Sequence, residues 1–402
     1  MRILAVNKFG YRRGGAENYL FNLGDALRAA GHEVEYFFMQ HPHNLTQRFD
    51  THFPPQMEFR AGASPAMVWR TIWNRVAARG LARVLDEFKP DIVHLHNIRY
   101  HLSASICRLL RKRHQPTVQT LHDYGSLCPA HHLFRAAHPC DRCLRYGLIA
   151  APLSRCLFGS YSRSLLGAAA EARDRFAAWT RRAVDYYICP SRFLRDKMAA
   201  AGMDRLVYLP HFVTIPDRPA ARDGGYALYL GRLDYEKGVD ILLKATAGLP
   251  ELQVKIAGSG SMAAGLEQLV HREDMKGRVA FWGQLDATRA MEVLSHAYML
   301  ILPSRAYENA PLAVYEALAA GVPVISSAPG GAVELLEGGA GITFPAGDVT
   351  ALRRSMADLL AQPDLAAEMG EKARRKAGAE WTVDRHIEGL MGIYQMAMGS
   401  KR

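Results

Sequence analysis

The sequence predicts an α/β protein with two doubly wound domains, and three observations predict it. The chain has 402 residues, more than twice the length of a typical domain. Short apolar runs alternate along it with stretches of helical period. This pattern stops at a segment rich in Pro, Gly and charge, and then starts again. With 49% hydrophobic and 22% charged residues, the composition excludes a disordered chain, collagen and a small disulfide scaffold.

The first half begins with a buried strand at residues 3–7. A loop with two glycines follows, and then a helix from about residue 18 to 30, which Gly31 ends. Further buried strands are predicted at 33–39, 90–96, 116–122, 185–191 and 207–210. Because helical stretches separate these strands, we expect them to lie parallel in one sheet. Residues 1–213 are the predicted first domain, with a Cys-rich insertion at about 124–160.

The second domain is predicted at residues 226–380, after a linker at 214–225. Its strands are predicted at 227–230, 253–257, 278–282, 299–302 and 323–326, and helices at 239–247 and 311–320. In the C-terminal part, 381–402, an apolar-periodic segment at 383–398 predicts a helix that crosses back to the first domain. Two such domains in tandem are expected to leave a cleft between the carboxyl ends of their sheets.

The positive charge lies entirely in the first half. Residues 1–215 contain 30 Lys and Arg against 16 Asp and Glu, which gives +14. The remainder contains 20 against 23, which gives −3, and the two sum to the net charge of +11. A basic half attracts nucleic acid, anionic lipid or a phosphorylated substrate, and charge alone does not choose among them.

The start of the chain reads directly as a strand, without the basic and long apolar regions of a secretory signal. No uncharged apolar run reaches the 18 residues that a membrane-spanning helix needs. We therefore expect a cytoplasmic protein with reduced thiols.

Two glutamates separated by seven residues dominate the most informative segment of the chain. Pro311 suits the first position of a helix and Gly321 its C-terminal cap, so Glu308 precedes the helix and Glu316 lies inside it. Eight residues of helical rise separate them by about 12 Å at most. They could hold two distant parts of one elongated ligand, or they could be two solvated glutamates. The spacing leaves both interpretations open.

Basic residues and glycines occupy two strand-to-helix loops of the same domain. Arg232 and Lys237 lie where a strand ends and a helix begins, a place where two cations can neutralise a pyrophosphate. Gly258 and Gly260 follow the next strand and allow a close approach of the backbone. Each signal is weak when it stands alone.

The order of these motifs along the chain resembles that in the retaining nucleotide-sugar glycosyltransferases of family 4. Those enzymes have the GT-B fold, in which two Rossmann-like domains face each other across a cleft. The resemblance implies that Glu308 lies against the donor sugar, that Glu316 binds the ribose hydroxyls, and that Arg232 and Lys237 bind the diphosphate. It also implies a donor site lined by Gly231, Gly258, Gly260, Ser304, Asn309, Ala310, Pro311 and Leu312.

The implied activity is retaining transfer of a sugar from a nucleotide-diphosphate sugar to a hydroxyl of a glycan or lipid-linked acceptor. Cell-surface polysaccharide biosynthesis, including lipopolysaccharide, is the implied setting. No cofactor is expected for the chemistry, because Arg232 and Lys237 would take the place of a metal. One alternative is a nucleotide-sugar epimerase or phosphorylase on the same architecture. A more remote one is a basic, zinc-bearing nucleic-acid-binding protein, which would leave Glu308 and Glu316 unexplained.

The first domain carries the residues expected on the acceptor side. Gly14 and Gly15 could adopt positive φ angles and, with Glu17, open a helix whose start favours an anion, although a simple tight turn is the alternative. His122 and Asp123 stand at the carboxyl end of a predicted strand. The resemblance places His122 close to the donor sugar, with Asp123 orienting it.

Four cysteines cluster in the insertion. Cys128, Cys140, Cys143 and Cys156 are spaced as Cys-x11-Cys-x2-Cys-x12-Cys. In a reducing compartment this spacing favours a structural zinc site over disulfides, and free thiols are the alternative.

Residues 148–178 mix apolar side chains with arginines. They could form an amphipathic helix that rests on anionic lipid, or a solvated helix that packs on its own domain. With the basic first half, they motivate the hypothesis that the protein contacts the inner face of the cytoplasmic membrane.

Overall fold

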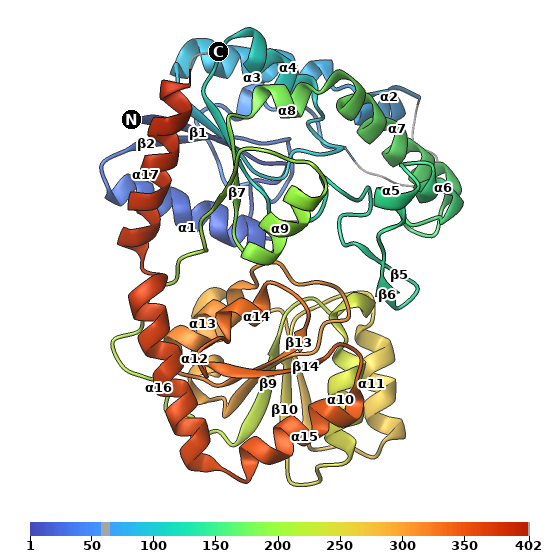
Figure 1. Cartoon of the computed structure of the whole chain (residues 1–402), viewed down its shortest axis with the longest axis vertical. Coiled ribbons are helices and arrows are strands. Elements are labelled where there is room, and N and C mark those ends of the chain that lie inside the picture. The colour runs from blue at the N-terminus through green and yellow to red at the C-terminus, as the bar shows by residue number, and fades with distance from the viewer. Residues whose placement is uncertain (58–64, 401–402) are drawn as a thin grey trace. The chain divides into compact units, whose positions relative to one another are not determined.

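A computed structural model describes residues 1–57 and 65–400 of the chain (Figure 1). The chain divides into two compact units. The first unit contains Met1–Leu133, Cys140–Leu209 and Ile387–Arg402, and the second contains Phe134–Pro139 and Pro210–His386.

The first unit is built on a sheet of six parallel strands. In chain order these are β1 (Arg2–Val6), β2 (Glu33–Phe37), β3 (Ile92–Leu95), β4 (Thr117–Thr120), β7 (Tyr186–Cys189) and β8 (Leu206–Tyr208). Their order in the sheet is β2-β1-β3-β4-β7-β8. The order reverses between β1 and β3, and loops leaving the carboxyl ends of two such strands diverge and leave room for a ligand.

Helices flank this sheet, and several start at a side-chain cap. They are α1 (Gly15–Ala29), α2 (Pro65–Ile72), α3 (Arg75–Phe88), α4 (Ser105–Lys112), α7 (Tyr161–Ala177), α8 (Trp179–Ala183) and α9 (Arg192–Ala200). Asn74, Ser160 and Ser191 cap α3, α7 and α9 by accepting hydrogen bonds from backbone N–H groups of the first turn. A short 3-10 helix, η1, covers Asp50–His52. The insertion adds the small strands β5 (Phe134–Arg135) and β6 (His138–Pro139) and the short helices α5 (Arg142–Arg145) and α6 (Ala150–Leu153).

The second unit repeats the architecture. Its strands are β9 (Tyr226–Leu230), β10 (Gln253–Ala257), β11 (Val279–Gly283), β12 (Met299–Leu302), β13 (Val324–Ala328) and β14 (Gly341–Pro345). They are parallel and lie in the order β11-β10-β9-β12-β13-β14, so the order reverses between β9 and β12. Two parallel sheets with flanking helices confirm the α/β prediction.

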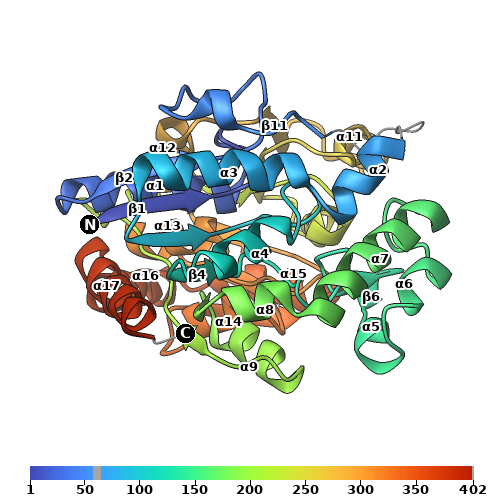
Figure 2. The ribbon, with the colours of Figure 1, turned by 90° about the horizontal axis from the view of Figure 1, so that it is seen from above.

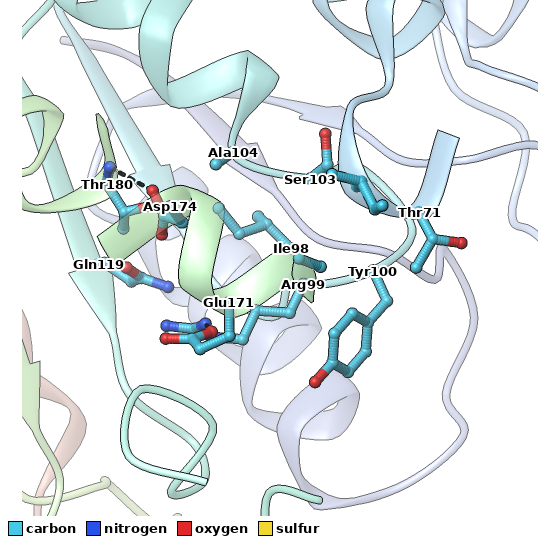
Figure 3. A pocket seen from close by; sticks show the side chains of 12 residues that line it. Thr71, Ile98, Arg99, Tyr100, Ser103, Ala104, Gln119, Glu171, Asp174 and Thr180 are labelled. Carbon is cyan, nitrogen blue, oxygen red and sulfur yellow. Dashed lines mark hydrogen bonds and ion pairs between the residues drawn. The ribbon is translucent and has the colours of Figure 1, made fainter. Parts of the chain in front are cut away.

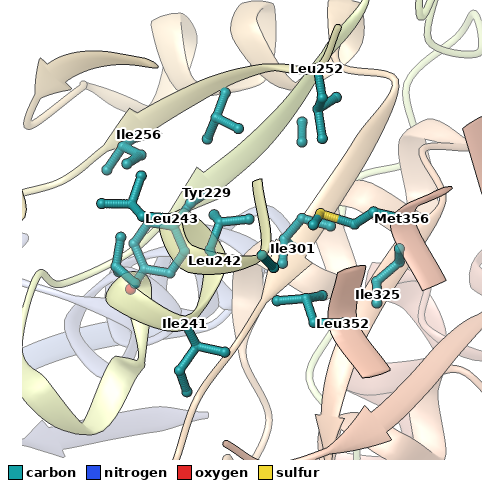
Figure 4. Close-up of a cluster of buried hydrophobic side chains, with 14 of the residues drawn as sticks. Tyr229, Ile241, Leu242, Leu243, Leu252, Ile256, Ile301, Ile325, Leu352 and Met356 are labelled. Carbon is teal, nitrogen blue, oxygen red and sulfur yellow. The ribbon is translucent and has the colours of Figure 1, made fainter. Parts of the chain in front are cut away.

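Two apolar clusters cover the two faces of the second sheet. The helices of this unit are α10 (Val239–Ala247), α11 (Ala263–Arg272), α12 (Ala287–His296), α13 (Leu312–Ala320), α14 (Ala332–Leu335), α15 (Val349–Leu360) and α16 (Pro363–Glu380), with a 3-10 turn, η2, at Tyr235–Lys237. Figure 4 shows one cluster, in which Leu242 of α10 and Met356 of α15 pack against Ile301 of β12. This packing fixes the strand ends from which the candidate site is built.

Several boundaries differ from the sequence prediction. α1 begins at Gly15, three residues before the expected start. α13 begins at Leu312, with Pro311 as its N-cap rather than its first residue. The elements β14, α14, α15 and α16 were not predicted.

The last helix, α17 (Val383–Gly399), ends one residue beyond its predicted range. Its first four residues belong to the second unit and the rest to the first. Among the described residues, no helix is both long and apolar enough to cross a membrane.

Candidate functional site

Two loops of the second unit meet at the reversal of strand order. One follows β9 and carries Gly231, Arg232 and Lys237, and the other follows β12 and carries Ser304 and Glu308. Because β9 and β12 are neighbours in the sheet, their carboxyl ends bring these two loops together.

Glycines allow the backbones of this region to pack directly on each other. Gly258 has a φ of 146°, and a Cβ there would lie 1.8 Å from the carbonyl oxygen of Gly231. A Cβ on Gly260 would lie 2.5 Å from the backbone of Leu233. Any side chain at these two positions would therefore push the β9 loop away from the β10 loop.

An ion pair joins the two loops. Lys237 Nζ donates to Glu308 Oε1 at 2.8 Å, and the Ser304 hydroxyl donates to the same oxygen. Burial by itself would raise the pKa of Glu308. The Lys237 ammonium and the hydrogen bonds from Lys237 and Ser304 outweigh burial, so this pKa lies below its ordinary value. Glu308 is therefore a carboxylate at neutral pH.

The guanidinium of Arg232 is held by two carboxylates of its own loop. It donates to Asp234, and to Glu236 Oε1 at 3.0 Å. Asp234 in turn accepts hydrogen bonds from the backbone N–H and the hydroxyl of Ser261. Arg232 is half exposed, so an anion that reaches the loop can exchange for these carboxylates.

Sequence reasoning missed Arg305. Its two terminal nitrogens each donate to a carboxylate oxygen of Asp240 at 2.7 Å, and its guanidinium lies 4.4 Å from the centre of the Tyr235 ring. This bidentate ion pair connects the β12 loop to the start of α10. The only available signal was the position of Asp240 in the first turn of a helix that follows the Arg232 loop.

Glu316 lies on α13 and is half buried. Burial raises its pKa to about 7, and within residues 1–57 and 65–400 no cation or hydrogen-bond donor contacts its carboxylate. The residues before it also have the predicted location. Asn309 is buried, and Ala310, Pro311 and Leu312 are half buried at the start of α13.

The first unit has a polar pocket at the carboxyl edge of its sheet. It is lined by Lys8, His96, Asn97, Ile98, Arg99, Gln119, Thr120, Leu121, His122, Asp123, Ser126 and His131. Asp123 accepts a hydrogen bond from Gly125 N at 2.7 Å and lies 3.2 Å from His131 Nδ1. Burial would raise the pKa of Asp123, but His131, Lys8 and the Gly125 N–H together lower it. Asp123 is thus ionised.

Three histidines form a row at this pocket, and two of them, His96 and His122, line it. His94 stacks on His96, and His96 on His122, whose Nε2 lies 2.9 Å from His96 Nδ1. Burial lowers the pKa of His122 to about 4, although Asp123 partly opposes the shift. His122 is therefore neutral at physiological pH. The strand register that brings the three side chains together is not visible in the sequence.

Sequence reasoning also missed Lys8 and Gln119. The ammonium of Lys8 is largely buried in the pocket, and burial lowers its pKa despite Asp123 and Glu17. Gln119 donates to the His96 carbonyl, and its buried Oε1 has no hydrogen-bond partner within the part of the chain that the structure describes. A single lysine after a strand and a glutamine inside one gave no motif to recognise.

The glycine loop differs from its expectation. Gly14 has a φ of −169°, which any residue can adopt, and Gly15 is the first residue of α1. Neither glycine uses the positive φ angle that it would permit. Glu17 is buried, its Oε1 accepts from Asn7 Nδ2 at 3.3 Å, and burial raises its pKa. Its role in the structure is to hold the turn between β1 and α1.

A second pocket lies beside the first (Figure 3) and shares Gln119 and Arg99 with it. Arg99 donates to the buried carboxylate of Glu171, which also accepts from Arg175 Nε at 3.0 Å. Asp174 Oδ1 accepts from Thr180 N at 3.0 Å, as the dashed line in Figure 3 marks. The Arg99–Glu171 ion pair anchors α7 to the loop that follows β3.

The four cysteines of the insertion give no support to the zinc prediction. Cys128, Cys140, Cys143 and Cys156 are free thiols. Among residues 1–57 and 65–400, no group of three His, Cys, Asp or Glu side chains is placed to hold a metal ion. The spacing of cysteines along a chain does not fix the directions of their Sγ atoms, and these directions decide whether a metal site forms.

Two family models match the chain. The model described as Glycosyltransferase Family 4 matches residues 13–215, slightly more than half of the chain, and the one described as Glycosyl transferases group 1 matches residues 215–376. The chain is a member of glycosyltransferase family 4. It is therefore a glycosyltransferase, an enzyme that transfers glycosyl groups. The pocket with His122 lies in the first matched region, and the loops with Lys237 and Glu308 lie in the second.

Known proteins resemble this glycosyltransferase along nearly its whole length. A glycogen synthase of Mycobacterium tuberculosis is 24% identical over 97% of this chain and 92% of its own. The Anabaena protein HepE, solved in complex with UDP-glucose, has a TM-score of 0.69 at 18% identity and covers 98% of this chain and 99% of its own. WaaG, described as a glycosyltransferase involved in lipopolysaccharide biosynthesis, has a TM-score of 0.68 at 17% identity with full coverage of both chains. The two structures support the GT-B type of fold.

Proposed function

We propose that this glycosyltransferase moves a sugar, with retention of anomeric configuration, from a nucleoside diphosphate sugar to a hydroxyl of a glycan or lipid-linked acceptor. The observation that carries the proposal is the Lys237–Glu308 ion pair, which joins the two loops at the reversal of strand order. It sets a cation and a carboxylate side by side at the place where such sheets bind ligands.

The reaction needs charges of both signs at one place. Breaking the bond between the sugar and the diphosphate develops negative charge on the leaving diphosphate and positive charge on the anomeric carbon. In the proposal, Arg232 and Lys237 stabilise the diphosphate, and the ionised Glu308 faces the sugar. No metal is required in this scheme, because the two cations neutralise the leaving group. Activity that persists in the presence of EDTA would support this part of the proposal.

Glu316 is proposed to bind the ribose of the donor. Its carboxylate is half buried, and no described side chain pairs with it. A vicinal diol offers two donors to one carboxylate, which would compensate for the cost of keeping this group out of water. The UDP-glucose in the HepE complex supports a nucleoside diphosphate sugar as the class of donor.

The pocket of the first unit is proposed to bind the acceptor. The ionised Asp123 and the unpartnered Oε1 of Gln119 can accept hydrogen bonds from sugar hydroxyls, and the neutral imidazole of His122 carries both a donor and an acceptor nitrogen. The charge of +14 in residues 1–215 favours an acceptor that carries phosphate, as lipid-linked glycans do. Assembly of a cell-surface polysaccharide on the cytoplasmic side of the membrane is the proposed setting, and the likeness to WaaG, a glycosyltransferase involved in lipopolysaccharide biosynthesis, supports it.

The proposal is tested with a panel of nucleotide sugars. We expect one donor to raise the melting temperature, because a ligand that binds only the folded state stabilises it. With that donor, release of nucleoside diphosphate should increase when an acceptor glycan is added. NMR of the product should show the same anomeric configuration as the donor. Conversion of the donor to an isomer without nucleotide release, or cleavage by inorganic phosphate, would contradict transfer and indicate an epimerase or a phosphorylase.

A further inference from the structure

Helix α7 exposes an apolar stripe. Tyr161, Leu165, Ala169, Ala172 and Phe176 follow one another at intervals of three or four residues, so they lie on one side of the helix, and all are exposed. Phe176 is 97% exposed. The side of α7 that is buried in the unit contains Ser164, Gly167, Ala168 and Glu171. An ordinary surface helix has the opposite arrangement, with its large apolar side chains facing the core.

The exposed apolar side chains continue onto the neighbouring elements. α6 packs against α7, α5 against α6, and α2 against α7. Figures 1 and 2 both show α5, α6 and α7 gathered together. The exposed large side chains of these elements and the turns between them are Val68, Trp69, Leu144, Tyr146, Ile149, Leu153 and Phe158. We call this set, with the α7 stripe, the α5–α7 face. Exposed apolar clusters of this kind mark interaction surfaces.

The charges of this face are mainly positive, and the acid at its edge, Asp141, pairs with Arg145 at 2.5 Å. Residues 142–170 contain four arginines and no Asp or Glu. The four are Arg142, Arg145, Arg155 and Arg163. Arg155 is exposed, and Arg163 lies over the ring of Phe158, with 5.3 Å between the guanidinium carbon and the ring centre. Apolar side chains interspersed with an excess of arginines complement a membrane surface, in which apolar acyl chains lie beneath anionic headgroups.

We propose that the α5–α7 face docks on a membrane that contains anionic lipid. The exposed apolar side chains enter the boundary between headgroups and acyl chains, and the arginines bind lipid phosphates. The insertion begins a few residues after His122 and Asp123 and belongs mainly to the same unit as their pocket. Docking through this face would therefore hold the proposed acceptor pocket at the surface where a lipid-linked acceptor resides.

The test is co-sedimentation of the full chain with vesicles of phosphatidylcholine, with and without phosphatidylglycerol. We expect binding to the mixed vesicles, weakened by high salt, and little binding to phosphatidylcholine alone. Phe176→Ser and Leu153→Ser should each weaken binding about tenfold, because each removes a large apolar group from the interface. Arg155→Glu should weaken it at least about fivefold.

Matched controls are Leu45→Ser, at an exposed apolar residue outside the face, and Arg354→Glu, at an exposed arginine of the second unit. Both should bind vesicles like the unaltered protein. Circular dichroism and release of nucleoside diphosphate to a water-soluble acceptor should be unchanged in all five variants, which separates docking from transfer. Equal vesicle binding by all variants would overturn the proposal. So would concentration-dependent self-association that Phe176→Ser abolishes without any vesicle binding, because the face would then be a protein interface.

Discussion

At the scale of single residues, the Lys237–Glu308 pair couples two loops that belong to different strands. Glu308 is largely buried and Lys237 is mostly covered, with 14% and 22% of their side chains exposed. Removal of either partner leaves the other as an uncompensated charge in a site of low polarity. The pair is therefore important both for the geometry of the site and for its charge.

Lys237→Ala and Glu308→Ala are each expected to reduce kcat by about a hundredfold or more, because each removes a charge positioned for the transition state. The measurement is the rate of nucleoside diphosphate release at saturating donor. Lys276→Ala, at an exposed lysine of the same unit, serves as the control and should retain full activity. Unchanged rates in both site variants would refute the assignment of this pair.

Glu316 predicts a specific dependence of stability on pH. Burial raises its folded-state pKa to about 7 from an ordinary 4.5. The folded state therefore binds the proton more tightly than the unfolded state, and ionisation reduces stability progressively between about pH 4.5 and 7. Glu316→Gln should remove this loss. Its melting temperature relative to the unaltered protein should rise over this range and then level off. A difference that does not change with pH would contradict the raised pKa.

The residues of the candidate site were predictable from the sequence where they belong to a motif with fixed spacing. Glu308, Glu316, Arg232 and Lys237 follow strand ends in a recognisable order, and the structure brings Lys237 into contact with Glu308. Arg305 and Asp240 are 65 residues apart in the chain, and their contact depends on how two loops fold together. No local sequence pattern predicts such a contact.

At the scale of elements, glycines decide how closely the loops of the second unit approach. Gly258→Ala should destabilise the protein by about 2 kcal/mol or more, because the new Cβ would collide with the Gly231 carbonyl and the residue has a positive φ. Gly392→Ala is the matched control. Gly392 lies exposed inside α17 with no atom near its potential Cβ, so alanine should stabilise the helix by about 0.5 to 1 kcal/mol.

Urea unfolding measures both changes. A Gly258→Ala variant as stable as the unaltered protein would show that the β9 and β10 loops can separate at little cost, which contradicts the close packing described above.

Fully buried strands were predictable from their apolar runs, and strands without such a run, or helices with a weak period, were not. β12 has four buried residues in a row and was predicted to the residue. In β14 only Phe344 is buried, so no apolar run marks it. α16 is rich in Ala, Glu, Lys and Arg and buries mainly small side chains such as Ala373 and Ala377, which weakens its periodicity.

At the scale of the whole molecule, buried histidines should limit stability in acid. Burial lowers the pKa values of His101 to about 3 and of His122 and His386 to about 4. The unfolded chain binds these protons near pH 6.5, so stability should fall as the pH decreases from about 6.5 towards 4.

The check is the urea midpoint of unfolding over this pH range, compared between the unaltered protein and His386→Gln. Glutamine can still donate to the Pro210 carbonyl, which the His386 ring now contacts at 2.7 Å. The variant should therefore lose less stability on acidification. His271→Gln, at an exposed position, is the control and should follow the unaltered protein. Parallel curves for all three proteins would mean that His386 is already protonated in the folded state.

The two-fold repeat of the architecture was predictable because each half has its own alternation of strands and helices. Whether the four insertion cysteines bind a metal or remain free thiols could not be predicted, because their spacing fits both. Whether a cluster of residues becomes a binding site depends on side-chain directions that only the folded backbone sets.

The distribution of thiols has a practical consequence for spectroscopy. Cys107 and Cys189 are buried in the first unit, and burial raises the pKa of each to about 12, so neither presents a reactive thiolate. The cysteines of the insertion include three that are partly exposed: Cys140, Cys143 and Cys156. Burial raises the pKa of Cys143 to about 12 as well, so exposure decides the order of labelling: a maleimide fluorophore or a nitroxide is expected to reach the partly exposed cysteines of the insertion before the two buried ones. With all but one of these cysteines replaced by serine, the protein carries a single label that would test the proposed approach to a membrane, while the residues of both sheets stay unlabelled.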